Sequence, residues 1–366
     1  GPSGSLKTEL LNSITGLPNV QTLDVLTPNT FLSGKQRKDP TASLLKKLPH
    51  GSILVMRDFT TVLAMRREQR AELLAQLRKI YDGHLTKATG EGGTSSLLSW
   101  EGKIGLICGC TLAIEEVRSF AAQLGERFVY FHLPTEAREQ AATQALANRE
   151  QLSVMRVNLQ EAVCGFLEGL TIPDHVEIPD NIRSWLVNVA DFVAFARSTV
   201  PRDRYTREIT DLPSPEIPTR LTQQLGSLAC GHAVLEGRNR VCEKDLSLIA
   251  ATAITCIPTR RRLILERLFE ASVSETTTAI AKSVDLPTNT ARRDLEDLTA
   301  LKLVRRITQG PGKADLWELT LYARKGWNAL AGTLRKPVQE TNKVPLSAKS
   351  TYVRKGKNKS RAISIS

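Results

Sequence analysis

The first eight residues of the chain have the residue types and the spacing of a phosphate-binding loop. The pattern G-x-x-x-x-G-K-[S/T] fits at every fixed position but one, because a leucine stands where the second glycine is expected. In such a loop, backbone N–H groups surround the phosphates of a nucleotide, the lysine reaches the terminal phosphates, and the Ser/Thr hydroxyl binds Mg²⁺. The candidate nucleotide-binding residues are Gly1, Ser3, Gly4, Ser5, Leu6, Lys7 and Thr8.

A nucleotide site also needs an acidic residue at the end of a neighbouring strand, where it holds Mg²⁺ directly or through water. The apolar run 53–56 leads to Arg57 and Asp58. Open α/β sheets bind ligands at the carboxyl ends of their strands. We therefore expect Thr8 and Asp58 to hold the metal. The alternative is that Asp58 only caps the helix that follows.

Together the two motifs resemble the AAA+ class of P-loop ATPases. Thr111 follows the next predicted strand, where that family carries a polar sensor of the γ-phosphate. Arg127 lies in a segment similar to the one that bears the arginine finger, which acts on the nucleotide of an adjacent subunit. Residues 218–246 resemble the helical lid of the minichromosome-maintenance and related branches, and Arg220 matches the second sensor arginine. The resemblance implies a homo-oligomer and catalytic roles for Asp58, Thr111, Arg127 and Arg220.

Two positions depart from the family pattern. Leu6 replaces a glycine that lets the backbone approach phosphate closely. Phe59 stands where the family has a glutamate that polarises the attacking water, so the motif predicts nucleotide binding and leaves hydrolysis open. Other readings remain: Arg127 can be an ordinary surface arginine, Arg220 can form only a helix-surface ion pair, and the Gly/Ser-rich start can be a cloning remnant. The loop motif also predicts a short apolar strand immediately upstream.

The C-terminal third resembles a winged helix-turn-helix domain. Apolar residues recur at helical spacing, Thr288 is a good N-cap, and a Gly-Pro-Gly turn separates two strand-like runs. The expected helices span 260–271, 276–284 and 289–303, and the hairpin strands span 303–307 and 315–319.

In that fold the third helix enters the major groove of DNA and the hairpin, or wing, contacts the backbone. The resemblance therefore implies DNA contacts from Asn289, Thr290, Arg292 and Arg293 on the helix, and from Arg305, Arg306 and Lys313 on the wing. The alternative is that the module packs against protein.

The distribution of charge supports a polyanionic partner. The 366 residues carry a net charge of +12, but residues 1–257 are neutral, with 28 basic and 28 acidic residues. Residues 258–334 have 13 basic and nine acidic residues, and residues 335–366 have nine and one. A basic end on a neutral body favours nucleic acid as the partner.

The elements that must position these residues follow from the apolar pattern. Residues 1–134 alternate apolar runs with polar helical stretches, such as 66–81, which predicts an α/β P-loop core with a parallel sheet. Residues 90–96 are expected to be a flexible loop, and residues 135–257 to be a helical lid region broken by the proline-rich stretch 211–218. The expected strands are 21–26, 52–56, 104–110 and 128–133. The expected domains are 1–134, 135–257, 258–326 and a basic, disordered tail 327–366.

Composition excludes several other classes. No apolar run approaches the roughly 20 residues needed to span a bilayer, and nothing at the start resembles a signal peptide. The six cysteines lack zinc spacing and are expected to be reduced thiols in a cytoplasmic protein.

The expected function is that of an ATP- and Mg²⁺-binding AAA+-like ATPase that acts on DNA in replication, mobile-element maintenance or transcription control. A nucleotide-gated DNA-binding regulator with little turnover is the alternative. A scaffold whose winged helix docks protein is the third hypothesis.

Overall fold

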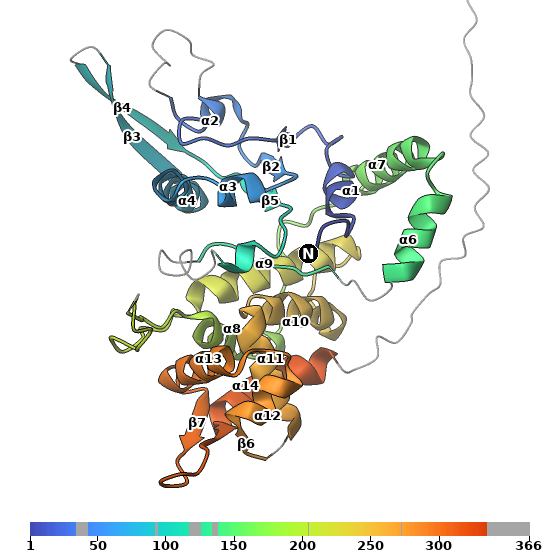
Figure 1. The fold of residues 1–366 in the computed structure, drawn as a ribbon. Helices are drawn as coiled ribbons and strands as arrows, with labels where there is room; N and C mark the ends of the chain where they lie inside the picture. Colours follow the sequence, from blue (N-terminus) through green and yellow to red (C-terminus); the bar gives the residue numbers. More distant parts are fainter. Residues whose placement is uncertain are drawn as a thin grey trace, which may run out of the picture.

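The computed structural model of the chain describes residues 1–33, 43–91, 94–116, 126–133, 138–203, 205–271 and 273–334; of residues 89–91 and 94–96 only the backbone is described. Figure 1 shows a small sheet with its helices, and a helical body that continues to residue 334. Residues 335–366 of the expected basic tail lie outside the described residues.

The sheet half is an α/β unit built on three parallel strands. The apolar run of β2 (Ile53–Met56) lies in the middle, between β1 (Val20–Leu23) and β5 (Gly105–Cys108). Three of the four expected strands are therefore present, each shorter than predicted, and the α/β class with a small parallel sheet is confirmed. The helices of this half are α1 (Lys7–Asn12), α2 (Leu44–Lys47), α3 (Thr60–Leu63) and α4 (Arg67–Tyr81).

The fourth expected strand, residues 128–133, is not a strand. The segment 126–133 has no regular secondary structure. A strand needs a neighbour about 4.8 Å away, whereas a cavity lies between this segment and β5. The apolar sequence is therefore present, but among the described residues no strand pairs with it, and the segment's backbone bonds to the side chains of Gln224 and Thr255 instead.

A long antiparallel hairpin lies between α4 and β5. Its strands are β3 (His84–Glu91) and β4 (Thr94–Glu101), and it projects from the sheet in Figure 1. Leu85 pairs with Trp100 at its base, and both side chains are buried in the core of the sheet half. The expected flexible loop 90–96 is wrong for residues 90–91 and 94–96, because these continue the two strands.

The expected helical region does contain long helices. These are α6 (Arg138–Ala147), α7 (Leu152–Glu168), α8 (Asp180–Arg197), α9 (Thr219–Leu235) and α10 (Leu246–Thr255), the last preceded by a 3₁₀ turn η3 (Glu243–Asp245). The interruption is longer than the proline-rich break, because residues 198–203 and 205–218 are also non-helical.

The C-terminal segment forms three helices, a small sheet and a last helix. The helices are α11 (Thr259–Ala271), α12 (Thr277–Ser283), α13 (Thr288–Ala300) and α14 (Leu321–Leu334), and β6 (Glu275–Thr276), β7 (Val304–Ile307) and β8 (Leu316–Leu319) pair in the order β6-β8-β7. Thr288 is the first residue of α13 rather than its N-cap, which is Pro287. The expected boundary at 326 falls inside α14, so the tail cannot begin at 327: Trp327 and Leu330 are apolar and buried in the core.

One hydrophobic core runs through α8 to α14. It joins the expected lid helices to the expected DNA-binding module without a boundary. At Gly326 of α14 an added Cβ would lie 2.4 Å from the ring of Phe192 on α8, so only glycine permits this approach. The sheet half has a separate core. Among the described residues, no helix combines the length and apolar character that a membrane span requires.

Candidate functional site

The loop before α1 contains two residues with a left-handed backbone. Gly4 has φ of +79°, and Leu6, directly before the helix, has φ of 58° and ψ of 13°. That left-handed conformation costs a non-glycine residue about 1 kcal/mol. Burial of the Leu6 side chain does not offset this energetic cost, because the side chain is 67% exposed. The leucine therefore occupies a glycine conformation at the motif's glycine position.

The Lys7 ammonium is held over this loop. Its Nζ donates to the carbonyl oxygens of Gly1 at 3.0 Å and Pro2 at 2.5 Å, and lies 3.3 Å from Ser5 Oγ. Thr8 and Ser3 are exposed. The loop thus concentrates one positive charge and several exposed polar groups at the start of α1.

The loop lies at the carboxyl ends of the parallel strands. The Gly1 nitrogen donates to Cys110 O at 3.2 Å, just beyond β5. Phe59 N donates to Gly109 O at 2.7 Å, which joins the ends of β2 and β5. Gly109 is required there, since an added Cβ would lie 2.7 Å from Arg57 O. The loop therefore lies at the carboxyl ends of the strands, as expected from the sequence.

Asp58 lies at the same edge and is exposed. Its Oδ1 accepts a hydrogen bond from Thr60 N at 2.9 Å, just before α3, but the N-cap of that helix is Phe59 and not Asp58. Thr111 follows β5, and its Oγ1 lies 3.4 Å from Ala113 N.

The Cys110 thiol lies close to the charged groups at the carboxyl ends of the strands. Burial raises its pKa, the Lys7 ammonium opposes the rise, and the Asp58 and Glu115 carboxylates add to it. The structure thus brings Lys7, Asp58 and Thr111 to one edge of the sheet. Glu115 joins them there, a carboxylate that sequence reasoning missed although it lies only five residues beyond Cys110.

Arg127 lies at the opposite end of the parallel strands, where their amino ends meet. Its guanidinium forms two 3.1 Å bonds to the Asp82 carboxylate and lies over the ring of Tyr81 at 5.9 Å. Burial would raise the pKa of Asp82, but the hydrogen bonds from Arg127 outweigh it and lower the pKa. Asp82 is next to Gly83, which bonds Gly102 at the amino end of β5. Arg127 is therefore remote from the loop of its own chain.

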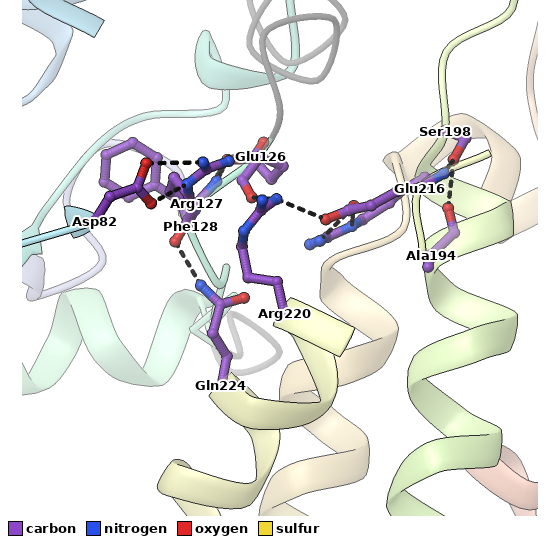
Figure 2. Close-up of polar contacts among 10 residues, drawn as sticks. Asp82, Glu126, Arg127, Phe128, Ala194, Ser198, Glu216, Arg220 and Gln224 are labelled. Atoms are coloured by element: carbon purple, nitrogen blue, oxygen red, sulfur yellow. Dashed lines mark hydrogen bonds and ion pairs between the residues drawn. The ribbon is translucent and has the colours of Figure 1, made fainter. Parts of the chain in front are cut away.

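Arg220 lies with Arg127 rather than with Lys7. Figure 2 shows its guanidinium between the Glu126 carbonyl, at 3.2 Å, and Glu216, at 3.1 Å. One turn later on α9, Gln224 donates to Arg127 O at 2.6 Å. Arg220 therefore forms an ion pair, as one reading of the sequence expected, but its partner Glu216 precedes α9 instead of lying on the helix.

A cavity of about 700 Å³ separates β5 from the segment 126–133. Its walls are mostly apolar and include Leu54, Leu77, Leu106 and Phe128. Near the start of the segment, Arg127 is bound at the amino ends of the strands, and at its end Leu133 lies 3.8 Å from the Cβ position of Gly1 at their carboxyl ends. It therefore runs parallel to β5, on the far side of the cavity.

The expected DNA-contact residues of α13 lie on its outer face. Asn289, Arg292 and Arg293 are exposed and Thr290 is half-buried, whereas Ala291, Asp294, Leu295 and Leu298 face the core. The four expected residues thus share the exposed start of one amphipathic helix.

The expected wing cations differ from those of the helix. Arg305 bonds Glu318 with Nε at 2.8 Å, and Arg306 bonds Asp315 with Nε at 2.8 Å while lying 5.6 Å from the Trp317 ring. Lys313 is exposed in the turn between β7 and β8. Two of the three wing cations are therefore balanced by carboxylates of the same hairpin.

No protein-family model matches the chain, and no curated protein matches it. Among the described residues there is also no group of three or more potential metal-ligating side chains of His, Cys, Asp or Glu, and the six cysteines are free thiols.

Proposed function

We propose that the chain is an AAA+-like P-loop protein that binds ATP with Mg²⁺ at the carboxyl edge of its sheet and binds DNA through a winged helix formed by α11 to α13 and the β7–β8 hairpin. The observation that carries the nucleotide half is the left-handed backbone of Leu6 beside Lys7. Strained backbone persists only where its surroundings or its use require it. A phosphate loop is a use that requires this conformation at this position.

The residues at the carboxyl ends of the strands are chemically suited to bind Mg²⁺-ATP. Lys7 Nζ now bonds loop oxygens, and a phosphate oxygen offers a stronger, charge-assisted bond in their place. The Thr8 hydroxyl and the Asp58 carboxylate are exposed oxygen donors, which is the ligand type that Mg²⁺ prefers. Bound Mg²⁺-ATP would supply the phosphoanhydride bond. The residues of the chain would orient the phosphates and supply positive charge beside them.

Phe59 supports the alternative of a nucleotide-gated regulator with little turnover. Its side chain is buried and packs against Phe128, with ring centroids 6.0 Å apart, so this position offers no base for a water molecule. Glu115 lies near Cys110, but its carboxylate accepts a hydrogen bond from Thr259 N at 3.2 Å and lies 3.8 Å from His132 Nε2.

The position of Arg127 supports an oligomer. At the amino edge of its own sheet it cannot reach the loop of its own chain. If it contacts a nucleotide, that nucleotide belongs to a neighbouring copy, as the arginine-finger resemblance implies.

ATP binding tests the nucleotide half. Fluorescent ATP titrated into the full chain should bind, and Lys7→Ala should reduce the affinity by at least tenfold. Lys103→Ala removes the same charge at the amino edge and should leave affinity unchanged. Leu6→Gly relieves the strained backbone and should bind at least as tightly. If wild type binds no nucleotide, both the ATPase and the switch are excluded.

Turnover separates the two functions. ATP hydrolysis that DNA stimulates and Lys7→Ala abolishes identifies an ATPase. Binding without hydrolysis identifies the regulator.

DNA affinity tests the second part of the proposal, which is DNA binding by the winged helix. Replacing Arg292 and Arg293 together by alanine should weaken duplex binding and lower the slope of log affinity on log salt by about 2. Replacing Arg66 and Arg67 of the sheet half is the matched control, because these arginines are also adjacent and exposed. Equal affinity of the two double variants would remove α13 from the DNA interface and favour a scaffold.

A further inference from the structure

The segment between α8 and α9 projects beside α13. Its residues 201–203 and 205–210, here called the α8–α9 loop, extend from the same side of the molecule as α13 and the β7–β8 hairpin. In the view of Figure 1, α13 lies between the loop and the hairpin. The helix proposed to enter the DNA groove is thus flanked by two projections, of which the sequence predicted only the hairpin.

One arginine fixes the loop to α13. The Arg202 guanidinium donates to Asp297 at 2.7 Å, to Glu296 at 3.1 Å and to the Arg293 carbonyl at 2.9 Å. Its Nη1 also donates to the carbonyl of Arg207, within the loop itself, at 2.5 Å. The loop therefore keeps a defined position relative to Arg293, one of the proposed DNA contacts.

The loop is also ordered internally. Asp203 Oδ1 accepts hydrogen bonds from the backbone N–H groups of Tyr205 and Thr206, both at 2.7 Å. Asp203 N donates to Glu208 O at 2.9 Å, and Arg207 holds a left-handed φ of 64°. Such an arrangement presents its tip in one conformation, which lowers the entropic cost of using it for binding.

The tip presents groups that suit a phosphate backbone. Tyr205 is 87% exposed, and Thr206 and Arg207 are exposed as well. Tyrosine and threonine hydroxyls and arginine guanidinium groups are standard donors to DNA phosphates. Thr206 Oγ1 accepts a hydrogen bond from Glu208 N at 3.3 Å within the loop, whereas the side chains of Tyr205 and Arg207 are exposed.

The three carboxylates that follow Arg293 in α13 are paired with arginines. Those of Asp294, Glu296 and Asp297 are each paired with an arginine from another segment. The partners are Arg260 for Asp294, Arg202 for Glu296, and both Arg202 and Arg261 for Asp297. The exposed Arg292 and Arg293 therefore act without a competing negative charge beside them.

We propose that the α8–α9 loop is a second DNA contact, and that Tyr205 and Arg207 bind the sugar–phosphate backbone of the duplex that α13 enters. The inference rests on the proposed DNA-binding function. It adds a contact from outside the winged helix, so that the helix is bracketed by loop and hairpin.

Duplex affinity of single-residue variants of the full chain tests this contact. Tyr205→Ala should weaken binding of a 30-base-pair duplex roughly threefold to tenfold without changing the salt slope, because an uncharged donor is lost. Tyr205→Phe should show most of that loss, since only the hydroxyl is removed. Arg207→Gln should weaken binding and lower the salt slope by about 1. Leu212→Ala is the control, because Leu212 is equally exposed but apolar and lies outside the loop.

The outcomes separate this inference from the function on which it rests. If the Arg292/Arg293 double variant loses affinity while Tyr205→Ala and Arg207→Gln bind like wild type, the loop contact is overturned and the DNA-binding winged helix stands. If wild type binds no duplex even at low salt, both fail. Unchanged DNA affinity together with loss of a bound protein on Tyr205→Ala would also overturn the loop contact and assign the loop to protein.

Discussion

The two halves of the molecule differ in how their cores are closed. In the helical half, α8 to α14 share one continuous core that is tight enough for Gly326 to meet the Phe192 ring without a side chain between them. In the sheet half, β5 pairs on one edge with β2, and its other edge borders a cavity of about 700 Å³. Helices satisfy their own backbone hydrogen bonds, whereas a sheet edge depends on another strand. The open half carries the nucleotide candidates, and the closed half carries the DNA candidates.

The largest expected effect comes from deleting the same side chain in each core. Leu225→Ala, in the closed core, should lower the free energy of unfolding by about 4 kcal/mol, and Leu54→Ala by about 3 kcal/mol. Both leucines are essentially buried, but Leu54 lines the cavity, where surrounding groups can relax. Hydrogen exchange resolved by segment measures both. An equal or greater loss for Leu54→Ala would show that the sheet half is packed as tightly as the helical half.

The closeness of α14 and α8 predicts the next effect. Gly326→Ala should destabilise the helical half by about 2 kcal/mol, because the new methyl group would overlap the Phe192 ring. Gly231→Ala is its matched control, since this helical glycine of α9 has nothing within 4 Å of the added Cβ and should gain about 0.5 to 1 kcal/mol. Thermal unfolding distinguishes them. A harmless Gly326→Ala would mean that the two helices separate easily.

A buried carboxylate makes the helical half sensitive to acid. Burial alone would raise the pKa of Asp245, but hydrogen bonds from Arg238, Cys242 N and His232 hold it at about 2. Because the folded pKa lies below the unfolded value of 3.8, the stabilisation is complete above pH 4 and is lost as the pH falls toward 2. The stability difference between wild type and Asp245→Asn should shrink by about 2 kcal/mol between pH 5 and pH 2. Parallel pH profiles of the two proteins would refute the assignment.

The smallest stability effect is expected on the hairpin. Glu318→Gln breaks an exposed ion pair with Arg305, so the free energy of unfolding should change by less than about 1 kcal/mol. Duplex affinity should rise instead, because Arg305 regains an unbalanced charge, and the salt slope should steepen by up to about 1. Unchanged DNA binding would place Arg305 outside the interface. Glu177→Gln, near Arg240, is a comparable exposed pair far from α13 and serves as control.

The same difference between halves limits what sequence predicts. Helices such as α4, α11 and α13 were located to within a few residues, because their apolar spacing is local. The segment 128–133 has an equally clear apolar run, but whether it becomes a strand depends on a neighbour elsewhere in the chain. The β3–β4 hairpin was missed because its glycines suggested a loop, although Leu85 and Trp100 marked its base.

The positions of the site residues were also predictable only where local sequence or strand direction decides them. Lys7 and Asp58 were placed at one edge correctly, since strand direction alone decides which ends meet. Arg127 lies at the amino end of the strands because it pairs with Asp82, a carboxylate distant in sequence, and Arg220 pairs there with Glu216, which is only four residues away. The α8–α9 loop had no recognisable motif, and only the fold brings Arg202 to α13.

Gly326 has a mechanical consequence. The missing side chain lets α14, a rod of about 21 Å, press directly on α8. The helices proposed as the lid and as the DNA contact share the core that α14 and α8 close at this point. A rotation of α9 relative to the sheet should therefore carry α13 with it.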